Sequence, residues 1–142
     1  MSTATVRFET EVPQIFELLG KVEAEVGSTP LDVGLRHLVK LRVSQINQCA
    51  YCVKMHSLEA RADGETNERL DRLVVWAQVS DFSAGEKAAL AWAEALTVID
   101  HRTDFGAMRA ALRIHFDDVE ITALTAAIAM INLWNRIQIS RH

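Results

Sequence analysis

Two cysteines and a histidine lie close together in residues 49–56, CAYCVKMH. If a helix begins near Cys49, then Cys49, Cys52 and His56 share one face of it, because side chains three and four residues apart are neighbours on a helix. The unpaired N–H groups at a helix start stabilise a thiolate and lower the pKa of a thiol below its usual value of about 8.5. The segment therefore predicts a reactive thiol with a second thiol one helical turn away.

A thiol pair of this kind carries out oxidation and reduction. A thiolate is oxidised to a sulfenic acid, and a neighbouring thiol condenses with it to an intramolecular disulfide. His56 follows Cys52 by one helical turn, and an imidazole in that place can take the proton of the thiol or return one to a leaving group. In a reducing compartment, paired cysteines are more often catalytic, redox-active or metal-bound than structural.

Other interpretations of these three residues stay open. Cys49, Cys52 and His56 offer three zinc ligands, although the sequence holds no fourth ligand at the spacing of a zinc finger. Two buried cysteines with a histidine satisfied in the core would carry no chemistry. Haem attachment requires a histidine where the chain has Val53, and a thioredoxin fold requires a βαβ pattern that is missing around the motif. We expect a redox site without metal or cofactor.

The composition is that of one ordinary globular domain. The chain has 142 residues, 49% of them hydrophobic, and a formal net charge of 15 − 19 = −4. A chain of this size buries about two-thirds of its unfolded surface and needs no disulfide for stability. Lys and Arg are scattered, which argues against a nucleic-acid partner. Residues 1–11 lack an apolar signal segment, and residues 121–134 fall short of the ~20 needed to span a bilayer, so we expect a cytoplasmic protein without a membrane partner.

Helices are predicted to form nearly the whole fold. The chain has only 2 prolines and 6 glycines, and no segment alternates as a strand would. Start signals are Thr29-Pro30, the capping-box pattern at Ser83, and Asp117. The sequence thus predicts an all-α, single-domain bundle over residues 1–142, with its core motif region at about 30–115. About seven helices are expected, near residues 12–26 (stopping at Gly27), 30–46, 49–62, 65–79, 87–99, 104–114 and 121–139.

Residues 41–56, LRVSQINQCAYCVKMH, resemble the core signature of the AhpD-like alkylhydroperoxidases of the carboxymuconolactone decarboxylase superfamily. The resemblance continues through residues 59–61, 64–66, 82–83, 88–96 and 132–136. It implies an AhpD-like helical fold and a homo-oligomer, commonly a trimer or hexamer. It also implies a hydroperoxide reductase, or a disulfide oxidoreductase, that is reduced again by an external dithiol. A long apolar helix carrying Trp134 likewise favours a homo-oligomer.

The resemblance also implies a role for each residue of the site. Cys52 corresponds to the cysteine that attacks the peroxide, Cys49 to the resolving cysteine, and His56 to a member of the proton relay. Well-studied members have a glutamate twelve residues before the first cysteine and a histidine directly before the second, where this chain has His37 and Tyr51. A neutral imidazole also accepts a proton at neutral pH. We therefore predict that His37 replaces that glutamate, pairing with His56 or with a bridging water near the thiols.

Two other functions stay open from the sequence. A helical, oligomeric binding or scaffold protein would keep the motif with little turnover, and both of its thiols would be inert, whereas an enzyme has one thiol of depressed pKa. Decarboxylase members of the superfamily act on a muconolactone without this cysteine pair. The presence of Cys49 and Cys52 therefore favours the peroxidase branch over the decarboxylases.

Overall fold

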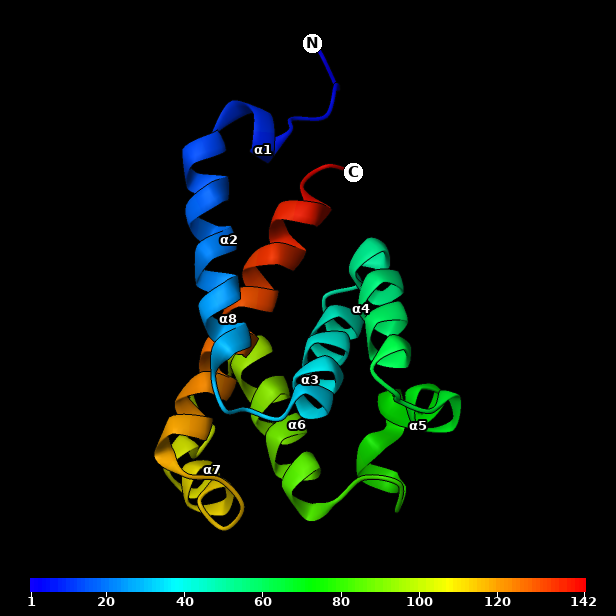
Figure 1. Ribbon diagram of the computed structural model, residues 1–142, viewed down its shortest axis with the longest axis vertical. Coiled ribbons are helices and arrows are strands. Elements are labelled where there is room, and N and C mark those ends of the chain that lie inside the picture. Colours follow the sequence, from blue (N-terminus) through cyan, green and yellow to red (C-terminus); the bar gives the residue numbers. More distant parts are fainter.

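The computed structural model describes residues 1–142 and consists of helices joined by short connections (Figure 1). It contains no strand, so the predicted all-α fold class is confirmed. No helix combines the length and apolar content that crossing a membrane requires. In chain order the elements are α1 (Phe8–Glu11), α2 (Pro13–Ser28), α3 (Val33–Ile46), α4 (Ala50–Ala62), α5 (Asn67–Arg72), the 3₁₀ helix η1 (Leu73–Gln78), α6 (Ala84–Thr97), α7 (Phe105–Leu112) and α8 (Asp118–Ile139).

The caps predicted for α6 and α8 are present. The Ser83 side chain accepts a hydrogen bond from the N–H of Glu86, and the Glu86 side chain accepts one from the N–H of Ser83. Asp117 and Glu120 form the same reciprocal pair at the start of α8. Such a capping box satisfies N–H groups that the start of a helix leaves unpaired. Local sequence therefore determines where both helices begin.

Two predicted boundaries near residue 30 are wrong. The start of α3 is capped by Asp32, whose carboxylate accepts a hydrogen bond from the N–H of Leu35 at 2.8 Å. Thr29 instead closes α2, donating its hydroxyl to the carbonyl oxygen of Val26, and α2 continues through Gly27. Thr29 and Asp32 are both good N-cap residues, and α3 uses Asp32, three residues after the predicted cap.

The single helix predicted for residues 65–79 forms two elements. α5 ends at Arg72, and η1 continues with a non-helical residue at Val75 (φ −119°, ψ 25°). Neighbouring β-branched residues such as Val74 and Val75 lose side-chain freedom in an α-helix, which weakens the helix there. The tighter 3₁₀ turn buries Leu73 and leaves both valines exposed.

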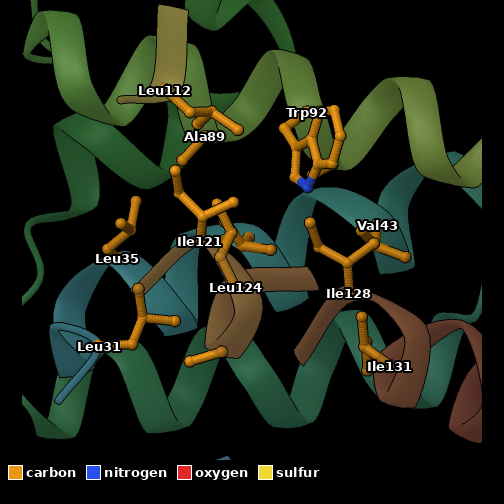
Figure 2. Close-up of a cluster of buried hydrophobic side chains, with 13 residues drawn as sticks. Leu31, Leu35, Val43, Ala89, Trp92, Leu112, Ile121, Leu124, Ile128 and Ile131 are labelled. Carbon is orange, nitrogen blue, oxygen red and sulfur yellow. The ribbon is translucent and has the colours of Figure 1, made fainter. Parts of the chain in front are cut away.

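The main core lies where α3, α6 and α8 meet (Figure 2). A second cluster joins α3 to α4, η1 and α6. Because α3 contributes side chains to both clusters, its rotation about its own axis is determined by packing on two sides, and with it the direction of the turn that leads into α4. The first cluster includes the buried residues Leu35, Val39, Val43, Trp92, Leu124 and Ile128. The second includes Leu38, Leu41, Ala60, Leu73 and Leu90.

Candidate thiol site

The two cysteines lie at the start of α4, directly after the sharp turn at residues 47–48 that connects α3 to α4 and is called the joint below. α3 ends at Ile46, as expected from the break in its apolar pattern, and Gln48 adopts a left-handed conformation (φ 56°). Cys49 is then the N-cap of α4, and its sulfur accepts a hydrogen bond from the N–H of Cys52 at 3.4 Å. Both sulfurs therefore lie in the first turn, where the unpaired N–H groups favour a thiolate.

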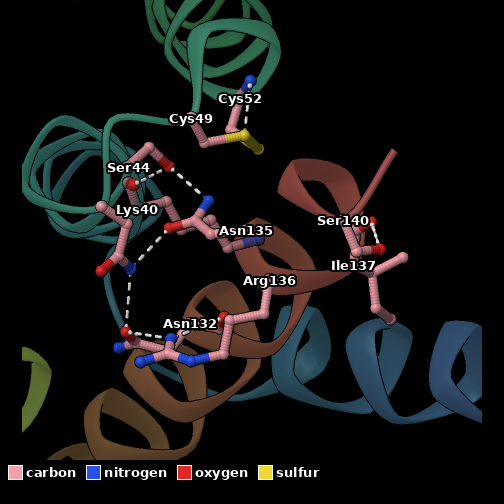
Figure 3. Close-up of a disulfide and its surroundings, with 10 residues drawn as sticks. Lys40, Ser44, Cys49, Cys52, Asn132, Asn135, Arg136, Ile137 and Ser140 are labelled. Atoms are coloured by element: carbon pink, nitrogen blue, oxygen red, sulfur yellow. Dashed lines mark hydrogen bonds between the residues drawn. A yellow bond between two sulfur atoms is a disulfide. The ribbon is translucent and has the colours of Figure 1, made fainter. Parts of the chain in front are cut away.

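Cys49 and Cys52 form a disulfide in this structure, with their Cα atoms 5.3 Å apart (Figure 3). Both residues are buried. They differ in access, because Cys52 is part of the wall of a cavity and Cys49 is not. A molecule that enters the cavity therefore contacts Cys52 and not Cys49.

A network of amides connects the joint to α8 (Figure 3). The Asn47 side chain donates to the side-chain oxygens of Asn132 and Asn135, at 2.9 and 3.0 Å. Asn135 donates in turn to the hydroxyl of Ser44 at 3.0 Å, and that hydroxyl donates to the carbonyl oxygen of Lys40 at 2.8 Å. Asn135 and Ser44 are fully buried. A buried polar group left without a partner costs about 1–3 kcal/mol, so the network holds α8 at a set position beneath the cysteines.

The cavity beside Cys52 has a volume of about 410 Å³ and is enclosed mainly by α2, α3, α4 and α8. Small-molecule sites in proteins span about 300–1,000 Å³. The rings of Phe16 and Trp134 meet edge to face across α2 and α8, with centroids 6.0 Å apart. The space therefore suits a small organic molecule, and its apolar walls comprise Phe16, Met55, Ile131, Trp134 and Ile137.

His56 lies in the wall of this cavity, one helical turn after Cys52. Its Nδ1 is 2.9 Å from Oε2 of Glu59, while its Nε2 is buried without a hydrogen-bond partner. Burial lowers the pKa of His56 below its usual value of about 6.5, and outweighs the hydrogen bond and charge of Glu59, which raise it. At neutral pH the ring is neutral and has a basic nitrogen available.

Two ion pairs complete the polar part of the cavity. Lys40 of α3 pairs with Glu23 of α2, and the indole N–H of Trp134 donates to Glu23 at 3.1 Å. Arg141, which follows α8, pairs with Glu9 of α1. Each of these cations therefore has a carboxylate partner, and the pairs tie the N-terminal helices to the walls of the cavity.

His37 does not join this site. Its Nε2 lies 2.6 Å from Oδ2 of Asp63, which follows the last residue of α4, and His37 is not among the residues that line the cavity. α3 and α4 form an antiparallel hairpin, so position 37 faces the end of α4, about 16 Å along the helix from Cys52 at 1.5 Å per residue. The structure thus shows His37 bonded to Asp63 and not directly to His56, while a link through a bridging water stays a prediction.

Glu23, Lys40 and Glu59 also belong to the site, although the sequence analysis did not assign them to it. Glu59 carries a usable signal, since it follows His56 by three residues, a spacing at which helix side chains meet. Glu23 and Lys40 carry none, because they lie on different helices and meet only in the folded chain.

No group of three or more His, Cys, Asp or Glu side chains is arranged to hold a metal ion.

Similarity to known proteins extends over most of the chain. The model of the carboxymuconolactone decarboxylase family matches residues 11–95, which include both cysteines and His56. The uncharacterized protein YdfG of Bacillus subtilis is 34% identical over 128 residues, covering 90% of this chain and 87% of its own.

Two solved structures share the arrangement of helices. The first is a protein of unknown function from Agrobacterium tumefaciens, described as a candidate antioxidant-defence protein AhpD. It matches with a TM-score of 0.91 at 35% identity, covering 98% of this chain and 95% of its own. The second is an uncharacterized peroxidase-related protein with an alkylhydroperoxidase AhpD core from Ralstonia eutropha. Its TM-score is 0.79 at 25% identity, and the match covers 90% of this chain and 68% of its own.

Proposed function

This chain belongs to the carboxymuconolactone decarboxylase family and has an AhpD-like fold, and we propose that it is a thiol-dependent hydroperoxide reductase. The observation that carries the proposal is the surroundings of Cys52. Cys52 lines a cavity, His56 lines the same cavity and has a buried Nε2 without a partner, and Cys49 is bonded to Cys52. A nucleophilic thiol, a base and a resolving thiol are the groups that this reaction requires.

The first half of the reaction takes place at Cys52. In the reduced protein His56 takes the proton of the Cys52 thiol, and the thiolate attacks one oxygen of the hydroperoxide. An S–O bond forms while the O–O bond breaks, so the sulfur loses two electrons and becomes a sulfenic acid. The peroxide gains these electrons and leaves as an alcohol, or as water, with the proton returned by His56.

The second half restores the disulfide and then the thiols. The thiol of Cys49 attacks the Cys52 sulfenic acid, so that an S–S bond forms and the sulfenic oxygen leaves as water. An external dithiol reopens this disulfide by exchange and is itself oxidised to a disulfide. The partners of the protein are thus a hydroperoxide and a dithiol reductant.

Mass spectrometry of the Cys49 and Cys52 peptides tests the proposal. We expect reduced protein to form the Cys49–Cys52 disulfide on treatment with dilute cumene hydroperoxide, and a dithiol to reverse it. In Cys49→Ser a sulfenic acid should accumulate on Cys52, since the resolving thiol is missing.

The reciprocal variant tests the assignment of roles. Sulfenic acid that forms in Cys52→Ser and not in Cys49→Ser would exchange the roles of the two residues. If both thiols of the parent stay reduced and titrate near the usual value, the chain is the scaffold protein described above, and the proposal fails.

A further inference from the structure

We propose that Glu59 is a positioning residue, which holds the proton of His56 on Nδ1 and thereby leaves Nε2 as the base that serves Cys52. The tautomer follows from the contacts of the ring alone. Its consequence for peroxide chemistry rests on the proposed function.

The argument begins with the hydrogen bond between the two side chains. Nδ1 of His56 and Oε2 of Glu59 are 2.9 Å apart, and one of the two atoms must supply the hydrogen. An ionised carboxylate only accepts hydrogen bonds, so Nδ1–H is the donor. A neutral imidazole carries a single N–H. Nε2 therefore has a free lone pair, and it is the buried ring atom without a partner.

The exposure of the two side chains explains why this arrangement holds. The side chain of His56 is 6% exposed, whereas that of Glu59 is 48% exposed. Water therefore solvates the charge of the carboxylate, and the pair avoids the full desolvation cost of a buried ion pair. Water has little access to the ring, so Glu59 is the partner that decides which ring nitrogen carries the hydrogen.

Charged groups on the neighbouring helices do not compete for this role. Lys40 on α3 lowers the pKa of His56 and Glu23 on α2 raises it, but these two residues pair with each other. Arg141 and Glu9 also border the cavity and are likewise paired. Among these groups, only Glu59 bonds the ring directly.

Glu59 has a second effect once the proton has moved. When Nε2 takes the proton of Cys52, the ring becomes an imidazolium with two N–H groups. The carboxylate of Glu59 then faces a positive charge and stabilises the imidazolium and thiolate together. Removing a partner that orients a metal-bound histidine typically costs about 10–100-fold in metal affinity or activity, and by analogy we expect Glu59→Gln to slow the oxidation of Cys52 about 10-fold.

Nitrogen NMR of the oxidised protein, with its histidines labelled, tests the tautomer without any peroxide. We expect His56 to carry its hydrogen on Nδ1 in the parent and to become a mixture of tautomers in Glu59→Gln. Asp63→Asn is the matched control, because Asp63 also pairs with a histidine of this hairpin but lies away from the cavity. It should leave the His56 signal unchanged.

The reduced protein supplies a second measurement, the pH profile of Cys52 alkylation. Its midpoint should move to higher pH in Glu59→Gln, return part of the way in Glu59→Asp, and stay unchanged in Asp63→Asn. A parent with the hydrogen on Nε2, or equal profiles in Glu59→Gln and Asp63→Asn, would overturn the role of Glu59. If the tautomer is as expected but peroxide leaves the thiols reduced, the proposed function fails while the positioning by Glu59 stands.

Discussion

His56 links the chemistry of the site to the stability of the protein. Burial lowers its pKa in the folded chain, whereas in the unfolded chain the pKa is about 6.5. Between these two values the unfolded state binds more protons than the folded state. The free energy of unfolding therefore rises with pH through this window, and it falls as the pH drops below about 6.5.

This linkage is measurable by urea denaturation of the oxidised protein. We expect the parent to lose stability between about pH 7 and pH 5, and His56→Gln to lose less over the same interval, because glutamine does not titrate. His101 is 94% exposed at its side chain, so His101→Gln serves as the control and should keep the parent profile. Parallel profiles for His56→Gln and the parent would show that another group causes the acid sensitivity.

Among the elements, the joint between α3 and α4 does most to place the thiols. Gln48 lies there with a φ of 56°, a conformation that costs residues other than glycine about 1–2 kcal/mol. Glycine adopts it freely but loses about 0.5–1 kcal/mol more conformational entropy on folding. A β-branched residue fits it worst.

Two substitutions at this position should change stability in opposite directions. We expect Gln48→Gly to raise the free energy of unfolding by about 0.5 kcal/mol and Gln48→Val to lower it by at least about 1 kcal/mol. The matched control is Gln45→Gly inside α3, where glycine should lower it by about 1 kcal/mol. Urea denaturation measures all three. A loss in Gln48→Gly as large as that in Gln45→Gly would contradict the strain at the joint.

At the scale of the whole molecule, α2 leaves apolar side chains uncovered. Ile15, Leu18 and Val22 are 50%, 60% and 46% exposed, and their spacing of three and four residues places them along one stripe of the helix. Tyr51 and Leu58 are exposed on α4. The stripe on α2 is contiguous apolar surface of a kind that marks protein interfaces.

We predict that the protein is a homo-oligomer which uses this stripe. Light scattering at micromolar concentration should give a multiple of the chain mass of 15.9 kDa, and the family resemblance favours a trimer or hexamer. Leu18→Glu places a charge in the stripe and should lower the mass. Ile99→Glu is the control, since Ile99 is an exposed apolar residue of a loop after α6. A parent mass near that of one chain would contradict the prediction.

Local signals were enough to predict much of this architecture. The two capping boxes and the start of α4 at Cys49 depend on hydrogen bonds between residues three positions apart, so a short segment of sequence contains everything that forms them. Prediction failed where two local solutions compete. Thr29 and Asp32 are both good caps within one turn, and the valines after Arg72 weaken an α-helix whose continuation depends on what Leu73 packs against.

The sequence by itself determined the helical class, the thiol pair and the shared face of Cys52 and His56, because each depends on helical periodicity within one segment. Only the tertiary structure decided that Cys52 and not Cys49 borders the cavity, that Glu23 and Lys40 meet, and that His37 contacts Asp63. These contacts join residues of different helices. They depend on how α3 is rotated between its two hydrophobic clusters and how α4 folds back along it, and both are determined by packing across the whole molecule.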